Sequence, residues 1–274
     1  MLGALLVSGA FIISSCQKDG LNMFGNSDLA GVADESFVQN ESAKIDDIVT
    51  LVSYNTFSGE RGLINQLPEC ATVTYDTLSA LRKVTVDFGT TPCFNEWDSK
   101  YRTGMIIITW TGDMQQAGTV KTITTENYYV GSVATELNKF DLTKTVTNMG
   151  VNEDGNVHFA IEVTNAVVTL FDGGTISWTA SHDRIWMQGT GTPDPDDDLF
   201  NITGGSQGTD SNGESFTVEI TAPLVKNACE WIVSGVKTIT HGNDPQKVID
   251  YGNGECDDIA IVTVNGNQHI IHLN

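Results

Sequence analysis

Short runs of Val, Ile, Thr and aromatic residues, separated by tight turn signals, restrict the fold of this chain more than any other feature. They recur from about residue 71 onward, and residues 83–88 alternate cleanly between apolar and polar side chains. β-Branched and aromatic residues favour strands, and strict alternation is typical of a strand with one buried face. The connections are short, and Asn265-Gly266 fits a two-residue type I′ turn. Strands joined in this way must be antiparallel, because parallel pairing needs long crossovers.

The pattern therefore predicts an all-β protein built as an antiparallel meander, either an extended twisted sheet or a sandwich. Periodicity alone does not decide between the two. One short N-terminal helix is also predicted, because Ile45, Ile48, Val49 and Val52 recur at the spacing of one helix face. Ser42 fits the N-cap of this helix, which we expect to cover an end of the β domain. No long helical pattern follows, which excludes folds that alternate helices and strands.

The chain begins with an apolar run that ends in Ile13-Ser14-Ser15-Cys16, the pattern of a lipobox. The run is too short to span a bilayer, which takes ~20 residues, but it fits the ~7–15-residue core of a signal peptide. It lacks the Lys or Arg that usually precedes that core. The alternative is that residues 1–15 form a buried element and that Cys16 is a core thiol. We predict that residues 1–15 are a lipoprotein signal peptide and that Cys16 is lipidated, with several acyl chains giving a stable anchor.

The rest of the chain divides into a tether and a β domain. Residues 16–40 are rich in Gly, Asn, Ser and Asp, which predicts a flexible tether. Residues 41–274 are predicted to form the β domain, with a possible internal boundary in the long loop near residues 189–212. Gln17-Lys18-Asp19 looks like the surface-export signal of Bacteroidota lipoproteins. We therefore expect an outer-membrane, lipid-anchored protein, with the cell surface favoured over the periplasmic side.

Several motifs of the β region together resemble uncharacterised β-rich lipoproteins that are common in Bacteroidota. The motifs are VTVDFG at 84–89 with Cys93, RTGMIIITWTG at 102–112, PLVK at 223–226 with Cys229 and Trp231, VSG at 233–235, and DYGNGECD at 250–257. The resemblance covers roughly residues 70–273. It implies a β-rich lipoprotein but no activity, and no functional residue is carried over from it.

Four cysteines remain when the lipidated one is set aside, namely Cys70, Cys93, Cys229 and Cys256. An even number in an exported protein favours disulfides, and four cysteines allow three connectivities. We favour Cys70–Cys93 and Cys229–Cys256, because each pair is close in sequence and flanks strands that are expected to be adjacent. A zinc site is disfavoured by the oxidising compartment and by the absence of a C-x-x-C motif.

Acidic residues far outnumber basic ones, with 35 against 14 and a net charge of −21. Such a field repels nucleic acid, so no nucleic-acid partner is expected. The densest acidic cluster includes Asp194, Asp196 and Asp198, with Asp197 between them. Carboxylates on a flexible loop suit calcium, and these three are the candidate ligands, although a solvated acidic loop is the simpler interpretation. Asp257-Asp258 is a weaker candidate for the same ion.

No combination of residues specifies a reaction. Ser181, His182 and Asp183 are neighbours in an extended segment, so they cannot face one another. We therefore expect a non-enzymatic envelope or cell-surface protein with a structural or interaction role, whose partner is a surface polysaccharide or an envelope protein. The alternative is a glycan-binding accessory lipoprotein that uses Trp97 and Trp186. A hydrolase comes third, since it would need convergent groups with shifted pKa values.

Overall fold

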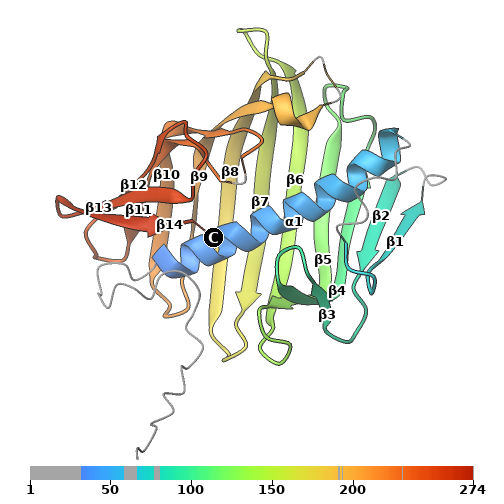
Figure 1. Cartoon of the computed structure of the whole chain (residues 1–274), viewed down its shortest axis with the longest axis horizontal. Coiled ribbons are helices and arrows are strands. Elements are labelled where there is room, and N and C mark those ends of the chain that lie inside the picture. Colours follow the sequence, from blue (N-terminus) through green and yellow to red (C-terminus); the bar gives the residue numbers. More distant parts are fainter. Residues whose placement is uncertain are drawn as a thin grey trace, which may run out of the picture.

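The computed structural model describes residues 32–58, 67–76, 81–190, 192, 194–229 and 231–273. Fourteen strands form a single antiparallel sheet, and thirteen of them follow one another across it in chain order, while β3 pairs with β4 to one side. One α-helix, α1 (Val32–Ser58), lies diagonally across one face of this sheet (Figure 1). The predicted all-β meander with one N-terminal helix is confirmed. The sequence left two alternatives, an extended twisted sheet and a sandwich, and the molecule adopts the extended sheet.

The strand bounds show that the longest strands occupy the middle of the sheet. The strands are β1 (Thr72–Asp76), β2 (Arg82–Asp87), β3 (Cys93–Asn95), β4 (Lys100–Trp110), β5 (Val120–Gly131), β6 (Asn138–Val151), β7 (Val157–Thr169), β8 (Thr175–Gln188), β9 (Leu199–Thr209), β10 (Ser215–Lys226), β11 (Ser234–His241), β12 (Lys247–Asn253), β13 (Ile259–Val264) and β14 (Asn267–His272). A short 3₁₀ helix, η3 (Pro195–Asp197), lies between β8 and β9. β8 pairs with β9 from Ser177↔Thr209 to Gln188↔Leu199, so the sheet continues across the loop that was predicted as a possible boundary.

Helix α1 is longer and placed differently than the sequence predicts. It begins at Val32, inside the segment predicted as a tether, so Ser42 lies within the helix and is not its N-cap. It crosses the face of the sheet instead of covering an end (Figure 1). The stripe that faces the sheet includes the buried polar residues Glu35, Glu41 and Ser42. These side chains interrupt the apolar periodicity, which therefore becomes visible only from Ile45 onward.

The core lies between α1 and the sheet. Val38, Ile45, Ile48, Val49 and Val52 of the helix are all at most 1% exposed. They belong to one hydrophobic cluster with sheet residues, among them Val84, Ile106, Ile108, Trp110, Ile123, Phe140, Trp178, Phe216 and Ile239. Full burial of one Val or Ile side chain stabilises a fold by about 1.5–3 kcal/mol. This packing therefore fixes which face of the sheet is buried.

Ion pairs between α1 and the sheet add to this packing. Both carboxylate oxygens of Glu35 lie 3.1 Å from the Lys237 ammonium, and Glu41 lies 3.8 Å from that of Lys100. Burial alone would lower the pKa of Lys237, but the neighbouring Glu35 carboxylate outweighs it and the pKa is raised. Burial raises the pKa of Glu41 in spite of the cations near it. The buried acids of α1 are therefore matched to sheet cations.

Among the described residues, none of the helical segments is long and apolar enough to cross a membrane.

Candidate binding surface

The sheet face that points away from α1, here called the bare face, carries rows of threonine. One row runs across adjacent strands through Thr85, Ile107, Thr124, Thr143 and Thr164. The side chains of the row are partly buried or exposed, and none is fully buried. In the described chain the helical elements are α1, on the opposite face, and η3 beside the β8–β9 connection. No element of the described chain therefore covers the bare face.

A second row lies beside the first and shows how regular the bare face is. It passes through Thr109, Thr122 and Thr145, which are paired directly across β4, β5 and β6. Adjacent strands are ~4.8 Å apart and same-face residues on one strand are ~6.8 Å apart. Hydroxyl and methyl groups thus repeat on a two-dimensional lattice. The continuation of this row reaches Glu162, whose carboxylate accepts a 2.7 Å hydrogen bond from Ser181.

Charged side chains flank the threonine rows on the bare face, among them Lys83, which pairs with Thr109, and Glu162, which pairs with Thr145. Lys139 and Asp141 lie there and form an ion pair of 2.8 Å. The hydrogen bond from Asp141 is the largest cause of the raised pKa of Lys139. On β4, β5 and β6 the two rows themselves are neutral, between these flanking charges, in a protein whose net charge is −21.

The tryptophans do not form a row on the bare face. Trp110 and Trp178 are 2% and 3% exposed and belong to the core. Trp97 is 45% exposed and lies under the Lys44 ammonium, 4.9 Å from its ring centroid. The indole nitrogen of Trp186 donates a 3.0 Å hydrogen bond to Asp198. Trp97 lies just before β4, whereas Trp186 lies near the end of β8. The structure therefore does not bring these two glycan-binding candidates together.

Two of the three predicted calcium ligands, Asp194 and Asp198, flank η3 and accept hydrogen bonds from the chain itself, while Asp196 lies within η3. Asp198 accepts the hydrogen bond from Trp186, and Asp194 accepts one of 3.0 Å from the backbone N–H of Asp196. Burial raises the pKa of Asp198 in spite of the Trp186 hydrogen bond. Calcium binding by Asp194, Asp196 and Asp198 stays a prediction. In the weaker candidate, Asp257 accepts from the backbone N–H of Ile259 at 2.9 Å, and Asp258 lies 2.8 Å from the His272 ring.

A different group of acids converges around His241, which the sequence did not single out. His241 Nε2 lies 2.8 Å from Asp210, and its Nδ1 lies 3.3 Å from Asp244 and 3.7 Å from Glu214. Lys247 also pairs with Asp244 at 3.2 Å. In the described part of the chain, Asp210, Glu214 and His241 are the group whose ligand atoms could hold one metal ion. The only part of this cluster visible in the sequence is the polar turn at 210–214. His241 is far from it in the chain and reaches it through the pairing of β10 with β11.

Electrostatics favour a structural role for this His241 cluster. Burial alone would raise the pKa of Asp210, but hydrogen bonds from the Glu214 backbone N–H and the His241 ring outweigh it, so the pKa is lowered. The pKa of Asp244 is lowered by its hydrogen bonds with the His241 ring and the Lys247 ammonium. Both carboxylates are thus held ionised beside the His241 ring and the Lys247 ammonium. This ties the β9–β10 turn to β11 and to the start of β12.

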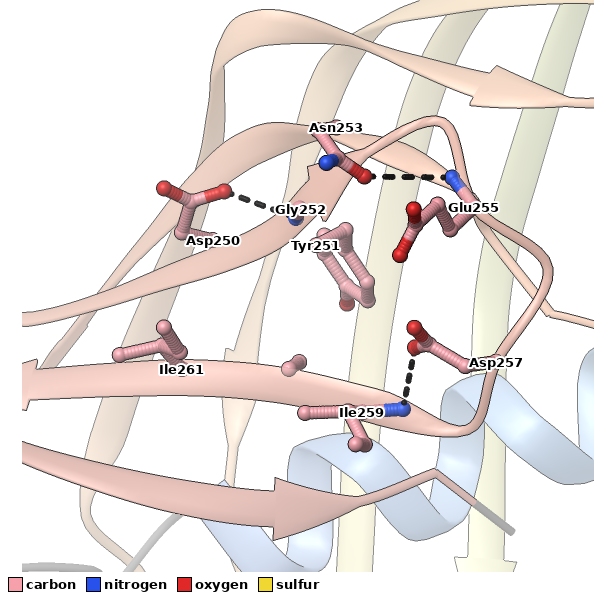
Figure 2. A pocket seen from close by; sticks show the side chains of 9 residues that line it. Asp250, Tyr251, Gly252, Asn253, Glu255, Asp257, Ile259 and Ile261 are labelled. Carbon is pink, nitrogen blue, oxygen red and sulfur yellow. Dashed lines mark hydrogen bonds between the residues drawn. The ribbon is translucent and has the colours of Figure 1, made fainter.

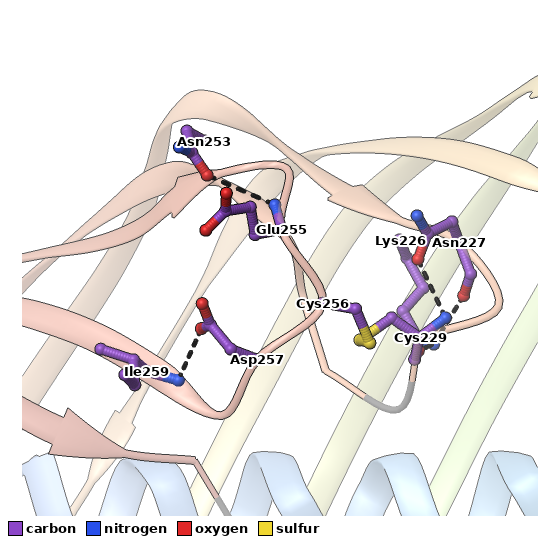
Figure 3. The surroundings of a disulfide bond; sticks show 8 residues. All are labelled: Lys226, Asn227, Cys229, Asn253, Glu255, Cys256, Asp257 and Ile259. Carbon is purple, nitrogen blue, oxygen red and sulfur yellow. Dashed lines mark hydrogen bonds between the residues drawn. A yellow bond between two sulfur atoms is a disulfide. The ribbon is translucent and has the colours of Figure 1, made fainter.

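Both predicted disulfides are confirmed. Cys70 is bonded to Cys93 with a Cα–Cα distance of 5.8 Å, which ties the segment before β1 to β3. Cys229 is bonded to Cys256 with a Cα–Cα distance of 5.6 Å (Figure 3). This second bond joins the segment after β10 to the β12–β13 loop. The Lys226 ammonium donates to the Asn227 carbonyl at 2.8 Å beside it.

The same β12–β13 loop borders a shallow pocket (Figure 2). Tyr251 lies in the middle of this pocket, with Glu255 and Asp257 on its loop side. The Tyr251 ring is 6.0 Å from the Lys237 ammonium, which is already paired with Glu35. The pocket is therefore an acidic depression with one aromatic ring, at the end of the sheet where the strands are short.

Cys16 and the predicted signal peptide and export signal lie outside the described residues. Comparison with known proteins adds no identity, since no family model, no curated protein and no solved structure matches this chain.

Proposed function

We propose that this protein is a non-enzymatic binding protein of the bacterial envelope, anchored in the outer membrane by lipid on Cys16. In this proposal the bare face contacts a neutral surface polysaccharide, and an envelope protein is the alternative partner. The observation that carries the proposal is the two neighbouring rows of threonine on a sheet face that no described element covers. The resemblance to β-rich lipoproteins of Bacteroidota is consistent with this role.

Charge supports a neutral polymer as the partner. A net charge of −21 repels anionic polymers over most of the molecule. Threonine hydroxyls can both donate and accept hydrogen bonds, as the hydroxyl groups of a sugar do. Their regular repeat also suits a partner that repeats along its own length. A neutral polysaccharide meets these conditions, because it carries no negative charge, presents hydroxyl groups and repeats along its length.

The arrangement of the buried ionisable groups supports a non-enzymatic role. Glu35 is engaged by Lys237, and His241 is engaged by Asp210 and Asp244. These pairs fasten α1 and the β9–β10 turn to the sheet. A catalytic acid or base would instead have to face a substrate cleft.

Charge placed on the bare face tests the proposal. The double variant Thr124→Glu/Thr145→Glu adds two carboxylates to adjacent rows, and we expect its retention on insoluble neutral polysaccharides to fall at least tenfold. Thr90→Glu, in the exposed β2–β3 connection, is the matched control and should bind as the wild type does. Equal binding by all three proteins would exclude the bare face as the contact. Binding to purified envelope proteins but to no polysaccharide in the panel would favour the alternative partner.

A further inference from the structure

Three basic side chains, Lys121, Lys144 and Arg184, lie on the sheet face that α1 crosses. Lys121 on β5 pairs with Val146, and Lys144 on β6 pairs with Ile123, so the two lysines are diagonal neighbours on one face. Arg184 on β8 lies on the same face and pairs with Phe159. The chain has 14 basic residues against 35 acidic ones. Placing three of the 14 together is therefore unfavourable unless something negative binds there.

Arg184 is held in place by aromatic rings and not by carboxylates. Its guanidinium carbon lies 5.3 Å from the ring centroid of Phe159 and 5.0 Å from that of Phe200. Its Nε is buried and has no hydrogen-bond partner among the described residues. Burial lowers the pKa of Arg184, against the more distant charges of Asp46 and Asp198. A buried N–H without a partner costs free energy, which an acceptor supplied by a ligand would recover.

Lys121 is in the same situation. Among the described residues it forms neither an ion pair nor a side-chain hydrogen bond, while Lys144 is paired with Asp46 of α1. Burial lowers the pKa of Lys121 to about 8, and the charges of Arg184 and Lys144 lower it further than the Asp46 charge raises it. The Asp46 side chain is 41% exposed and is the acid that forms an ion pair with the group among the described residues. The positive charge of the group is therefore only partly neutralised.

The other titratable neighbours of the three cations do not neutralise the remaining positive charge. His182 lies on the same face, three strands from Lys121 in register, and burial lowers its pKa to about 4, with Lys144 and Lys237 acting in the same direction. It is therefore neutral at pH 7. Asp198, whose charge acts on Arg184, accepts the hydrogen bond from Trp186.

An apolar floor lies beside the three cations. Val146, Phe159 and Ile161 form a small hydrophobic cluster of their own, separate from the main core. Partly buried Met114 and Trp186 pack against it. A ligand with an anionic end could therefore also bury an apolar or ring portion here.

We infer that Lys121, Lys144 and Arg184 form a binding site for a phosphate or sulfate group, carried by a small ligand whose apolar or ring portion lies on the partly buried Met114 and Trp186 that pack against this hydrophobic cluster. A tetrahedral oxyanion offers acceptor oxygens in several directions, which suits donors that approach from three different strands. Arg binds such groups through a rigid fork of donors and Lys as a point charge. This site is on the face opposite the bare face, so it is independent of the polymer contact proposed above.

Titration calorimetry with simple anions tests the site. The probes are inorganic phosphate, inorganic sulfate, phenyl phosphate and hexyl phosphate, added to the full-length protein at constant ionic strength. We expect phenyl phosphate or hexyl phosphate to bind more tightly than inorganic phosphate, and the stronger of the two tells a ring-bearing ligand from an acyl-bearing one. Lys121→Gln and Arg184→Gln should each weaken binding at least tenfold, the loss expected for one charged hydrogen bond.

Lys139→Gln is the matched control, because it removes the same charge from the bare face and should not change the affinity. If all three variants weakened binding equally, the loss would reflect only the change in net charge, and the proposed site would be wrong. The absence of binding by every probe at millimolar concentration would also overturn the site.

Stability provides a second readout, since replacement of Arg184 also removes contacts with two rings. Lys121→Gln should raise the melting temperature while it weakens binding, because it removes a cation that is repelled in the free protein. If Lys121→Gln lowered both the melting temperature and the affinity, Lys121 would have only a structural role. That result would overturn the proposal even if the Arg184 variant did not fold.

Discussion

At the scale of single residues, Lys121 is a charge that the fold holds at a cost. A desolvated ammonium beside other cations is destabilised relative to the unfolded chain, where its pKa is the ordinary one. Its folded pKa of about 8 lies below the ordinary lysine value of 10.5. The unfolded state therefore binds more protons than the folded state between these two pH values. The contribution of Lys121 to stability is unfavourable below pH 8 and is relieved as the pH rises toward 10.5.

Lys121→Met should therefore be more stable than the wild type at pH 7, by about 1–3 kcal/mol. The advantage should shrink as the pH rises from 8 to 10.5 and the wild-type ammonium loses its proton. Urea unfolding of both proteins across this range measures the difference directly. An advantage that does not change with pH would mean that side-chain packing, and not the charge, is responsible.

At the scale of elements, α1 is secured by acids that face the sheet. Glu35→Gln should cost about 3–5 kcal/mol, because it leaves the buried Lys237 without its carboxylate. Adding Lys237→Met to this variant should restore much of the loss, since no buried charge then remains unpaired. Glu96→Gln, at an exposed turn, is the control and should change stability little. The check is the melting temperature of each variant, and an additive loss in the double variant would contradict the pairing.

The same buried acids explain what the sequence could and could not predict about the elements. The turn signals predicted the hairpins well, and Asn265 and Gly266 have the positive φ angles, 50° and 79°, that a type I′ turn requires. The disulfide pairs followed from strand adjacency along the chain. The start of α1 did not follow, because Glu35 and Glu41 are indistinguishable by type from solvent-exposed helix residues. Only their partners on β11 and β4, far along the chain, reveal that they face inward.

At the scale of the whole molecule, alternation predicted one buried face for each strand but not what buries it. A second sheet and a single helix both leave the same alternating pattern, so the sandwich could not be excluded. The group of Lys121, Lys144 and Arg184 was equally hidden. Its members come from three strands and carry no local motif, and they meet because the register of β5, β6, β7 and β8 places them on one face.

The anchor is also a property of the whole molecule. With a complete signal peptide in place, Cys16→Ala should move the protein from the membrane fraction to the soluble fraction, because the acyl chains that hold it at the bilayer would be missing. Fractionation, together with mass spectrometry of the N-terminal peptide, measures this. An unchanged partition without any lipid-modified peptide would reject the lipoprotein assignment.

The order of the strands has a consequence for how the molecule is made. Nearly every strand pairs with its neighbour in the chain, so each hairpin closes a short loop and the sheet can grow one strand at a time. Helix α1 is the exception, because Glu35 reaches Lys237 across 202 residues. The helix is synthesised before any of the described strands, yet its first turn finds its ion-pair partner only when β11 is in place. We therefore expect α1 to be the first element made and among the last to be docked.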